Sequence, residues 1–206
     1  QFGGLVNFIM KKPSKIKKLE FIHRNTFGSN DLYTNFTSVS GSIKKFSYLS
    51  FINYKQGDGF RKNSGFESIN TYNYFKYKIN KKIWLSTEFT YLNYIAQQAG
   101  GLSDQMFIED HFQSNRSRNW FQINWMLYNL YINFKASSTK TISFNLFGLD
   151  AKRDALGFRT NRVSQVDSGE ERDLIKGDFN NYGFELKYLS RYKIKSKKSN
   201  LLLGTK

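Results

Sequence analysis

Hydrophobic and polar residues alternate along most of the chain, in segments that have the length of β-strands. The alternation is clearest where Ile83, Leu85 and Phe89 are separated by Ser86 and Glu88. Successive side chains of a strand point to opposite faces, so this period of two predicts strands with one apolar and one polar face. The predicted strands cover residues 15–27, 31–42, 45–56, 66–79, 82–96, 119–135, 140–153, 179–193 and 199–206. Residues 120–134 are apolar on both faces, so their register stays open.

The connections between these segments are alternately short and long. The short ones are rich in lysine and cover 42–45, 80–82, 137–140 and 193–198, whereas the long ones are polar and cover 56–65, 97–118 and 154–178. In an up-and-down antiparallel sheet, all short connections then lie at one end and all long ones at the other. This asymmetry is typical of outer-membrane β-barrels. One tight turn, residues 27–31, lies at the long-loop end, where Gly28 and Asn30 tolerate a positive φ.

Composition agrees with a membrane-embedded sheet. Aromatic residues make up 17% of the chain and there is a single proline, which favours strands over helices. No apolar run of about 18 residues is present, so a helical membrane span is excluded. A barrel strand needs only one apolar side, and the low mean hydropathy of −0.57 is compatible with it. A carboxylate in mid-strand must face water, so we expect Glu88 to face a polar lumen and Ile83 to face lipid.

Tyrosine and tryptophan residues near the predicted strand ends fit the aromatic belts of membrane interfaces. Cross-strand packing in a soluble sheet is the alternative explanation, but the rhythm of short and long connections favours the belts. The predicted belt residues are Tyr33, Tyr54, Tyr72, Trp84, Tyr94, Trp120 and Tyr192.

The net charge of +16 raises the possibility of a nucleic-acid partner. However, the lysines gather in the short connections, and arginines mixed with acidic residues gather in the long ones. Two charged belts at opposite ends of a strand array fit lipid headgroup flanks better than a nucleic-acid track. We therefore expect no nucleic-acid partner.

Signatures of an enzyme are missing from the sequence. The chain has no cysteine, which excludes thiolate metal sites and disulfides. It has no glycine-rich phosphate loop and no Ser–His–Asp arrangement. Glu109, Asp110 and His111 have the chemistry of a metal cluster, but no second ligand group stands at a matching spacing, so we interpret them as a solvated loop. The expectation is a protein that is not an enzyme and has no cofactor.

Several motifs resemble a known family. The segment GGLVNFIMKKP at 3–13 resembles the end of the plug domain of TonB-dependent outer-membrane receptors. The ferric-dicitrate branch of that family is similar in a series of motifs that follow in order along the chain. These are YKQGDGFR at 54–61, NSGF at 63–66, AQQAGGL at 96–102, QSNRSRNWFQ at 113–122, RDALGF at 153–158 and RDL at 172–174. Ala99 stands where the resemblance leads us to expect proline.

The resemblance implies an all-β fold: an antiparallel up-and-down transmembrane β-barrel of 22 strands, closed by a plug. Residues 1–13 are then the carboxyl-terminal end of the plug, and residues 14–206 the amino-terminal part of the barrel. About eight to nine strands are expected here, so the barrel is open and incomplete, and both ends of the chain look cut. The implied location is the outer membrane of a Gram-negative bacterium. The implied partners are outer-membrane lipid and TonB with ExbB and ExbD.

The implied cargo is a ferric chelate, carried as a substrate and not as a cofactor. Citrate-bound iron is small, anionic and rich in carboxylate oxygens, which match the planar paired donors of arginine. The candidate ligand residues are Arg116, Arg118, Arg153, Arg159, Arg162, Arg172, Gln97 and Gln98. The alternative is that these arginines pair with Asp154, Asp167, Glu170, Glu171 and Asp173 and so hold the loops in shape.

A different class of function also stays open at this stage. A non-energised porin, or a barrel that displays its loops for adhesion, has the same strand pattern. A porin has no plug, so residues 3–13 favour the receptor. The cut ends also leave room for the remnant of a degraded gene.

Overall fold

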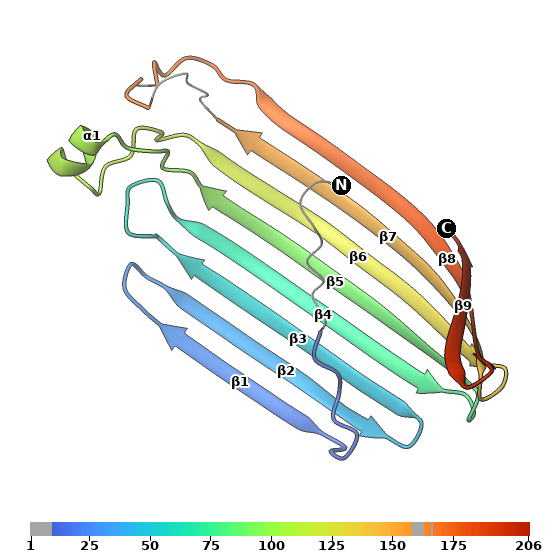
Figure 1. The fold of residues 1–206 in the computed structure, drawn as a ribbon. Coiled ribbons are helices and arrows are strands. Elements are labelled where there is room, and N and C mark those ends of the chain that lie inside the picture. The colour runs from blue at the N-terminus through green and yellow to red at the C-terminus, as the bar shows by residue number, and fades with distance from the viewer. Residues whose placement is uncertain (1–9, 158–162, 166) are drawn as a thin grey trace.

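The computed structural model describes residues 10–157, 163–165 and 167–206. They form one antiparallel sheet of nine strands whose order in space is their order in the sequence (Figure 1). The strands are β1 (Glu20–Phe27), β2 (Tyr33–Ile43), β3 (Phe46–Gly57), β4 (Phe66–Lys78), β5 (Ile83–Gln97), β6 (Trp120–Lys135), β7 (Lys140–Leu156), β8 (Leu174–Ile194) and β9 (Lys197–Thr205). The one helix of the described residues is α1 (Asp104–Glu109), and no helix in this part of the chain is long and apolar enough to span a membrane. The predicted all-β, up-and-down fold is confirmed.

Strand lengths grow along the sheet, from 8 residues in β1 to 21 in β8. β1 begins at Glu20 and not at residue 15, because the Ser14 hydroxyl accepts hydrogen bonds from the backbone N–H groups of Ile16 and Lys17 and holds a turn there. β7 and β8 are longer than predicted, and their ladder extends to the Leu156–Leu174 pair. The added stretch of β8 places Leu174 and Ile175 side by side before Lys176, Gly177 and Asp178, so apolar and polar residues do not alternate there and the pattern gave no signal for a strand.

The tight turn between β1 and β2 was predicted correctly in place but not in detail. Asn30 has the expected positive φ of 58°, and the second such residue is Asp31, at 53°, not Gly28. Two of the lysine-rich turns use the same device, since Lys44 and Lys195 both have φ of 53°. One left-handed residue in each of these two turns, and two in the turn between β1 and β2, let the chain reverse within a few positions.

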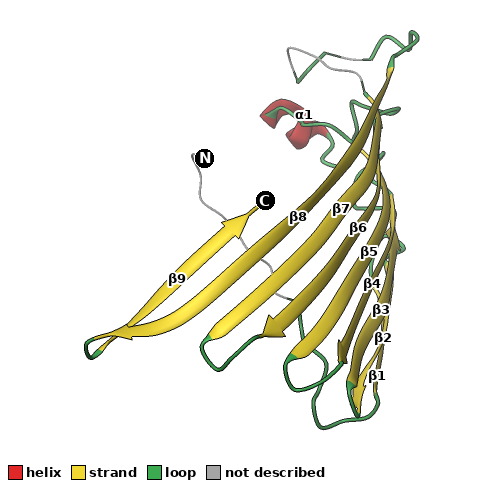
Figure 2. Cartoon of the chain, turned by 90° about the vertical axis from the view of Figure 1, so that its right-hand side faces the viewer, coloured by secondary structure: helices red, strands yellow, loops and turns green. Residues whose placement is uncertain are grey.

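The ladder sorts side chains onto two faces. Glu88 lies opposite Tyr74 of β4 and Asn129 of β6. The buried residues Leu49, Tyr72, Ser86 and Asn133, which are 4–8% exposed, share its face. The sheet curves, and α1 lies on its concave side (Figure 2).

The face that carries Glu88 is the concave one. Met10 and Lys11, from the segment that precedes β1 and crosses the sheet in Figure 1, line a small cavity together with Ile22, Phe36 and Leu49. These three strand residues share the face of Glu88 in the ladder. Ile83 and Phe89 point to the convex side, so Glu88 and Ile83 lie on opposite faces as predicted.

The convex face has an apolar band that stops partway along the strands. On β6 it runs from Phe134 through Ile132 to Met126, and Asn124 follows it. Residues 126–134 match the roughly 9–11 residues that a transmembrane β-strand needs. Beyond the band, the long strands continue toward the long loops with polar residues on the same face.

A row of tyrosines marks the upper border of this band. Tyr128 and Tyr182 donate their hydroxyls to Asp150, at 2.9 and 2.6 Å, and Tyr91 lies at the same border on β5. An apolar ring with a polar tip suits a membrane interface. The predicted belt is therefore partly wrong, because Tyr72, Trp84 and Tyr94 lie on the concave face. Trp84 and Tyr94 are an even number of positions from Glu88 along β5, and Tyr72 pairs with Thr90 of the same face.

Candidate functional site

Three loops, the long-loop cluster, meet at one end of the sheet (Figure 1). Residues 58–65 join β3 to β4, residues 98–119 join β5 to β6, and residues 157–173 join β7 to β8. The middle loop contains α1, which is capped by the Ser103 hydroxyl accepting a hydrogen bond from the Met106 N–H. The cluster stands where sequence analysis expected ligand to bind.

Arg61 and Asn63 fasten the first loop to the second. The Arg61 guanidinium donates to the carbonyls of Gly100 (2.9 Å) and Gln113 (2.9 and 3.1 Å). The Asn63 amide donates to the carbonyls of Gln98 (3.1 Å) and Asn119 (3.2 Å), and also to that of Arg116. Asn63 has a positive φ of 54°, which asparagine tolerates better than most residues. The two loops therefore form one hydrogen-bonded body.

Arg116 fastens the second loop to the third. It is only 6% exposed, and its Nη1 donates to the carbonyls of Asn115 (2.6 Å) and Gln165 (2.8 Å). The Asn115 amide donates to the Val163 carbonyl at 2.6 Å. Gly100 makes room for this arrangement: its φ is +75°, and a Cβ added there would lie 2.5 Å from Cγ of Arg116.

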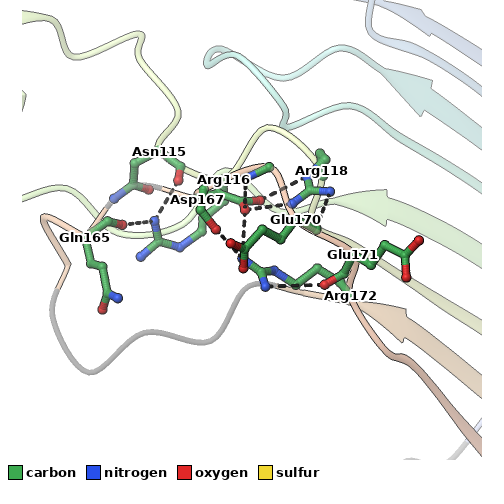
Figure 3. A network of polar contacts seen from close by, with 10 residues as sticks. Asn115, Arg116, Arg118, Gln165, Asp167, Glu170, Glu171 and Arg172 are labelled. Carbon is green, nitrogen blue, oxygen red and sulfur yellow. Dashed lines mark hydrogen bonds and ion pairs between the residues drawn. The ribbon is translucent and has the colours of Figure 1, made fainter.

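Asp167 is the centre of the charged part of the network (Figure 3). Its carboxylate receives two hydrogen bonds from Arg118, at 2.7 and 3.1 Å, one from Arg172 at 3.1 Å, and one from the Gly169 N–H at 3.0 Å. The Asp167 side chain is only 7% exposed. These donors, Arg118 first, hold the pKa of the Asp167 carboxyl well below its usual range. The same contact raises the pKa of Arg118.

Arg118 and Arg172 thus do what the alternative interpretation proposed, since both pair with Asp167. Arg118 also donates to the Glu170 carbonyl at 2.9 Å, and Arg172 to the Glu171 carbonyl at 3.4 Å. Glu170 and Glu171 join this network through their backbone and not through the carboxylates that the alternative invoked. Ligand contact by these two arginines stays a prediction, because the network does not test it.

The two glutamine candidates lie at the base of the second loop. The Gln97 side chain accepts a hydrogen bond from the Gly65 N–H at 3.1 Å, and the ladder places it on the convex face. It lines a cavity of about 420 Å³ whose acidic lining residues, Asp31, Asp58 and Glu67, suit an anion poorly. Gln98 contributes its backbone, which bonds to Asn119 and Asn63.

Among the arginine candidates that the structure describes, Arg153 differs from Arg116, Arg118 and Arg172 because its guanidinium makes none of the hydrogen bonds that join or shape the long loops. It is exposed on the concave face of β7, opposite Ile123 of β6 and Gly177 of β8. Its Cζ atom lies 5.0 Å from the centre of the Phe121 ring. Within the described residues, no carboxylate forms an ion pair with it. A cation stacked on an aromatic face keeps its edge N–H groups available to an anion. Arg159 and Arg162 lie outside the described residues.

Glu109, Asp110 and His111 have local partners. The Glu109 carboxylate accepts from the Gln105 amide at 2.9 Å, and that of Asp110 accepts from the Phe112 N–H at 2.9 Å. The His111 ring packs against Phe112, with centroids 4.0 Å apart. In the described part of the chain, no group of three or more acidic, histidine or cysteine side chains is placed to hold a metal ion.

Sequence reasoning did not single out the residues that organise the cluster. Asn63 was only part of a motif, and Asp167 was one of five acids named as possible partners of the arginines, although together these two residues connect all three loops. Asparagine within an Asn-Ser-Gly turn was a usable signal for a left-handed residue whose amide is free to bond. No signal distinguished Asp167 from the other four acids, because Arg118 lies 49 positions away from it in the sequence.

The chain is similar in fold to three solved iron-uptake proteins. The ferric citrate transporter FecA in its unliganded form superimposes with a TM-score of 0.74 at 18% identity, over 90% of this chain and 27% of that one. The ferric-catecholate import receptor Fiu from E. coli K12 gives 0.71 at 10% identity, over 94% and 34%. The siderophore receptor PiuA from Acinetobacter baumannii gives 0.74 at 10% identity, over 94% and 30%.

These matches establish the fold: the nine strands correspond to an open section of such a receptor barrel. The chain spans about a third or less of the length of the proteins it matches. Neither the protein-family models nor the curated protein sequences give a match.

Proposed function

We propose that this chain is part of an outer-membrane receptor that imports a ferric chelate, with energy supplied through TonB, ExbB and ExbD. The main support is the combination of fold and polarity. The sheet is similar to three solved iron-uptake proteins, its convex face carries an apolar band of membrane length, and its concave face carries polar residues such as Ser86, Glu88 and Asn133 among the apolar ones. The long-loop cluster then lies on the outer side of a Gram-negative outer membrane and the lysine-rich turns on the periplasmic side.

A receptor with an occupied lumen fits better than an open porin. Met10 and Lys11 lie against the concave face and share a cavity with Phe36 and Leu49. In the proposal, residues 1–13 belong to the end of a plug and residues 14–206 to the barrel wall. An open porin has no need for a segment in this place.

Ferric citrate is the proposed cargo. The support is electrostatic: Arg153 presents a guanidinium to the concave side directly beneath the long-loop cluster, stacked on Phe121. Carboxylate oxygens of a citrate complex are matched acceptors for such a donor. Arg61, Arg116, Arg118 and Arg172 preorganise the loops above it, so less ordering entropy is lost when the cargo binds. No covalent bond is made or broken in this function.

Uptake of radiolabelled ferric citrate by cells that express the full-length gene tests the proposal. We expect Arg153→Ala to lower uptake at limiting cargo by about tenfold, because it removes a charge-assisted contact. Lys152→Ala is the matched control, since Lys152 is the neighbouring cation and lies on the convex face. Equal uptake by both variants would remove Arg153 from the cargo site. Uptake of a ferric catecholate in place of ferric citrate would change the cargo, and uptake without TonB would exclude energised transport.

A further inference from the structure

A second concentration of positive charge lies at the opposite end of the concave face, by the short turns. A cavity of about 740 Å³ is lined there by Lys45, Lys76, Lys78, Lys81, Lys135 and the ring of Trp84, which we call the lysine cavity. Its residues come from β4, β5, β6 and the two turns beside them. It is remote in the fold from the long-loop cluster and has no part in the site described above.

The ladder shows that the strand residues of the cavity, Lys76, Lys78, Trp84 and Lys135, share the concave face. Lys78 of β4 lies opposite Trp84 of β5, and Trp84 lies opposite Asn133 of β6. Lys76 and Lys135 are each two positions from a member of this row and therefore point the same way. A soluble anion inside the barrel reaches this surface, whereas lipid outside does not.

The frame of the cavity is built by specific hydrogen bonds. The Asn80 side chain accepts from the N–H groups of Lys82 (2.8 Å) and Ile83 (2.9 Å), which fixes the turn between β4 and β5. Lys45 crosses from the neighbouring turn, and its Nζ donates to the Ile79 carbonyl at 2.8 Å. The lysines therefore project from an ordered rim.

The Trp84 ring lines the cavity and orients the ammonium group of Lys76. The Nζ atom of Lys76 lies 3.7 Å from the centre of the Trp84 ring, and Tyr131 packs beside that ring with centroids 5.1 Å apart. A cation over an indole face is held electrostatically, yet its remaining N–H bonds stay available. Lys76 is thus preorganised to donate into the cavity.

The charges of the cavity are not balanced within the described residues. None of its lining residues is acidic. The ion pairs of the described chain use Glu20, Asp167 and Glu185 as their acids, with other cations as partners. Lys12 and Lys15 from the segment before β1 add to the repulsion that acts on Lys76. A multivalent anion relieves the mutual repulsion of several ammonium groups at once.

We propose that the lysine cavity is a second anion-binding site, which takes small multivalent carboxylates on the periplasmic side of the barrel. Its role as the exit site of the chelate rests on the proposed function, whereas anion binding itself does not. Lysine suits an exit site because its ammonium is a flexible point charge without the paired geometry of arginine. Cargo is therefore attracted there and released again.

Calorimetric titration of the purified full-length receptor in neutral detergent with iron-free citrate tests the site. We expect the Lys76→Gln, Lys135→Gln double variant to bind citrate at least about tenfold more weakly than the wild-type receptor. Lys44→Gln, Lys82→Gln is the matched control: it removes the same charge at the same end of the sheet, but from turn residues that do not line the cavity. Citrate binding is expected to weaken as sodium chloride rises from about 50 to about 300 mM.

Two results would overturn the inference: equal citrate affinity in both double variants, or no citrate binding by the wild-type receptor. The second result is expected if acidic residues of the plug already fill the cavity. The single variant Lys135→Gln repeats the test if the double variant does not fold, with β-sheet circular dichroism as the criterion. Capture of ferric citrate on the surface of chilled cells separates this site from the proposed function. If ferric citrate is captured normally but the two double variants bind citrate equally, only the lysine cavity is rejected. If the Lys76→Gln, Lys135→Gln variant binds citrate more weakly than its control but ferric citrate is not captured, only the assignment of ferric citrate as cargo is rejected.

Discussion

The two ends of the sheet both gather positively charged side chains, but among the described residues only the lysine cavity gathers them without acidic neighbours, and the two ends use them differently. At the long-loop cluster, arginines donate to carbonyls or share Asp167, so most of their donors serve the loop structure. In the lysine cavity, ammonium groups face one another without an acidic lining residue. The fork of arginine fixes several partners at once, while lysine keeps a mobile charge. Positive residues therefore build one end and create an electric field at the other.

The largest effect is expected from removing Asp167, because two arginines depend on it. Asp167→Asn leaves Arg118 and Arg172 without their shared carboxylate, and we expect cleavage in the loop 157–173 by added protease to become about tenfold faster. Asp173→Asn is the control, since Asp173 is an exposed carboxylate of the same loop. The lysine cavity is expected to bind citrate as before. Equal cleavage of both variants would mean that Asp167 does not hold the loop.

Acid is expected to affect the long-loop cluster and to spare the lysine cavity. The folded-state pKa of Asp167 is lowered, so its stabilising contribution is fully present above the unfolded value of about 3.9 and is lost as pH falls below it. A spin label at Glu171 should keep constant mobility from about pH 8 to pH 5 and become mobile only in stronger acid. In Asp167→Asn, the acid-dependent step should be absent. A mobility change near neutral pH would contradict the assignment.

Asn63 gives the smallest of these effects and separates bonding from backbone strain. Asn63→Gly removes the amide donors but accepts the positive φ, whereas Asn63→Ala adds a left-handed cost of about 1 kcal/mol. Hydrogen exchange in residues 98–119 should therefore speed up in both variants, by a few-fold more in Asn63→Ala. Equal rates in the two variants would show that φ at this position is not a constraint, and unchanged rates would show that the amide does not link the loops.

The sequence was most informative where one face of a strand had to be apolar. In β5, Ile83 and Glu88 have to lie on opposite sides, and the ladder places them so. At the start of β8 the apolar residues Leu174 and Ile175 are adjacent and are followed by Lys176, Gly177 and Asp178, so no alternation is visible and the strand was predicted five residues short. Trp84 was assigned to the membrane belt from its position near a strand end. Trp84 lies four positions before Glu88 in the same strand, so the sequence already indicated that both side chains point to the same face, which is the concave one.

The candidate site was less predictable for a different reason. Which arginine meets ligand and which meets Asp167 depends on how loops far apart in sequence pack on one another. Arg118 and Arg153 look equivalent in the sequence, but one is in a loop beside a nearly buried carboxylate and the other is on a strand above Phe121. The lysine-rich turns were interpreted as a headgroup-level belt, yet Lys45 and Lys81 of those turns line the lysine cavity. The register of β4, β5 and β6 adds Lys76, Lys78 and Lys135 to the same side.

The growth in strand length from β1 to β8 has a geometric consequence. At about 3.3 Å per residue, β8 is roughly 40 Å longer than β1 along its own axis. Within these nine strands the rim is therefore slanted, with a low side at β1 and β2 and a tall screen behind it at β7 and β8. Arg153 lies on the inward surface of this taller part, so under the proposed function it faces cargo that enters over the low side.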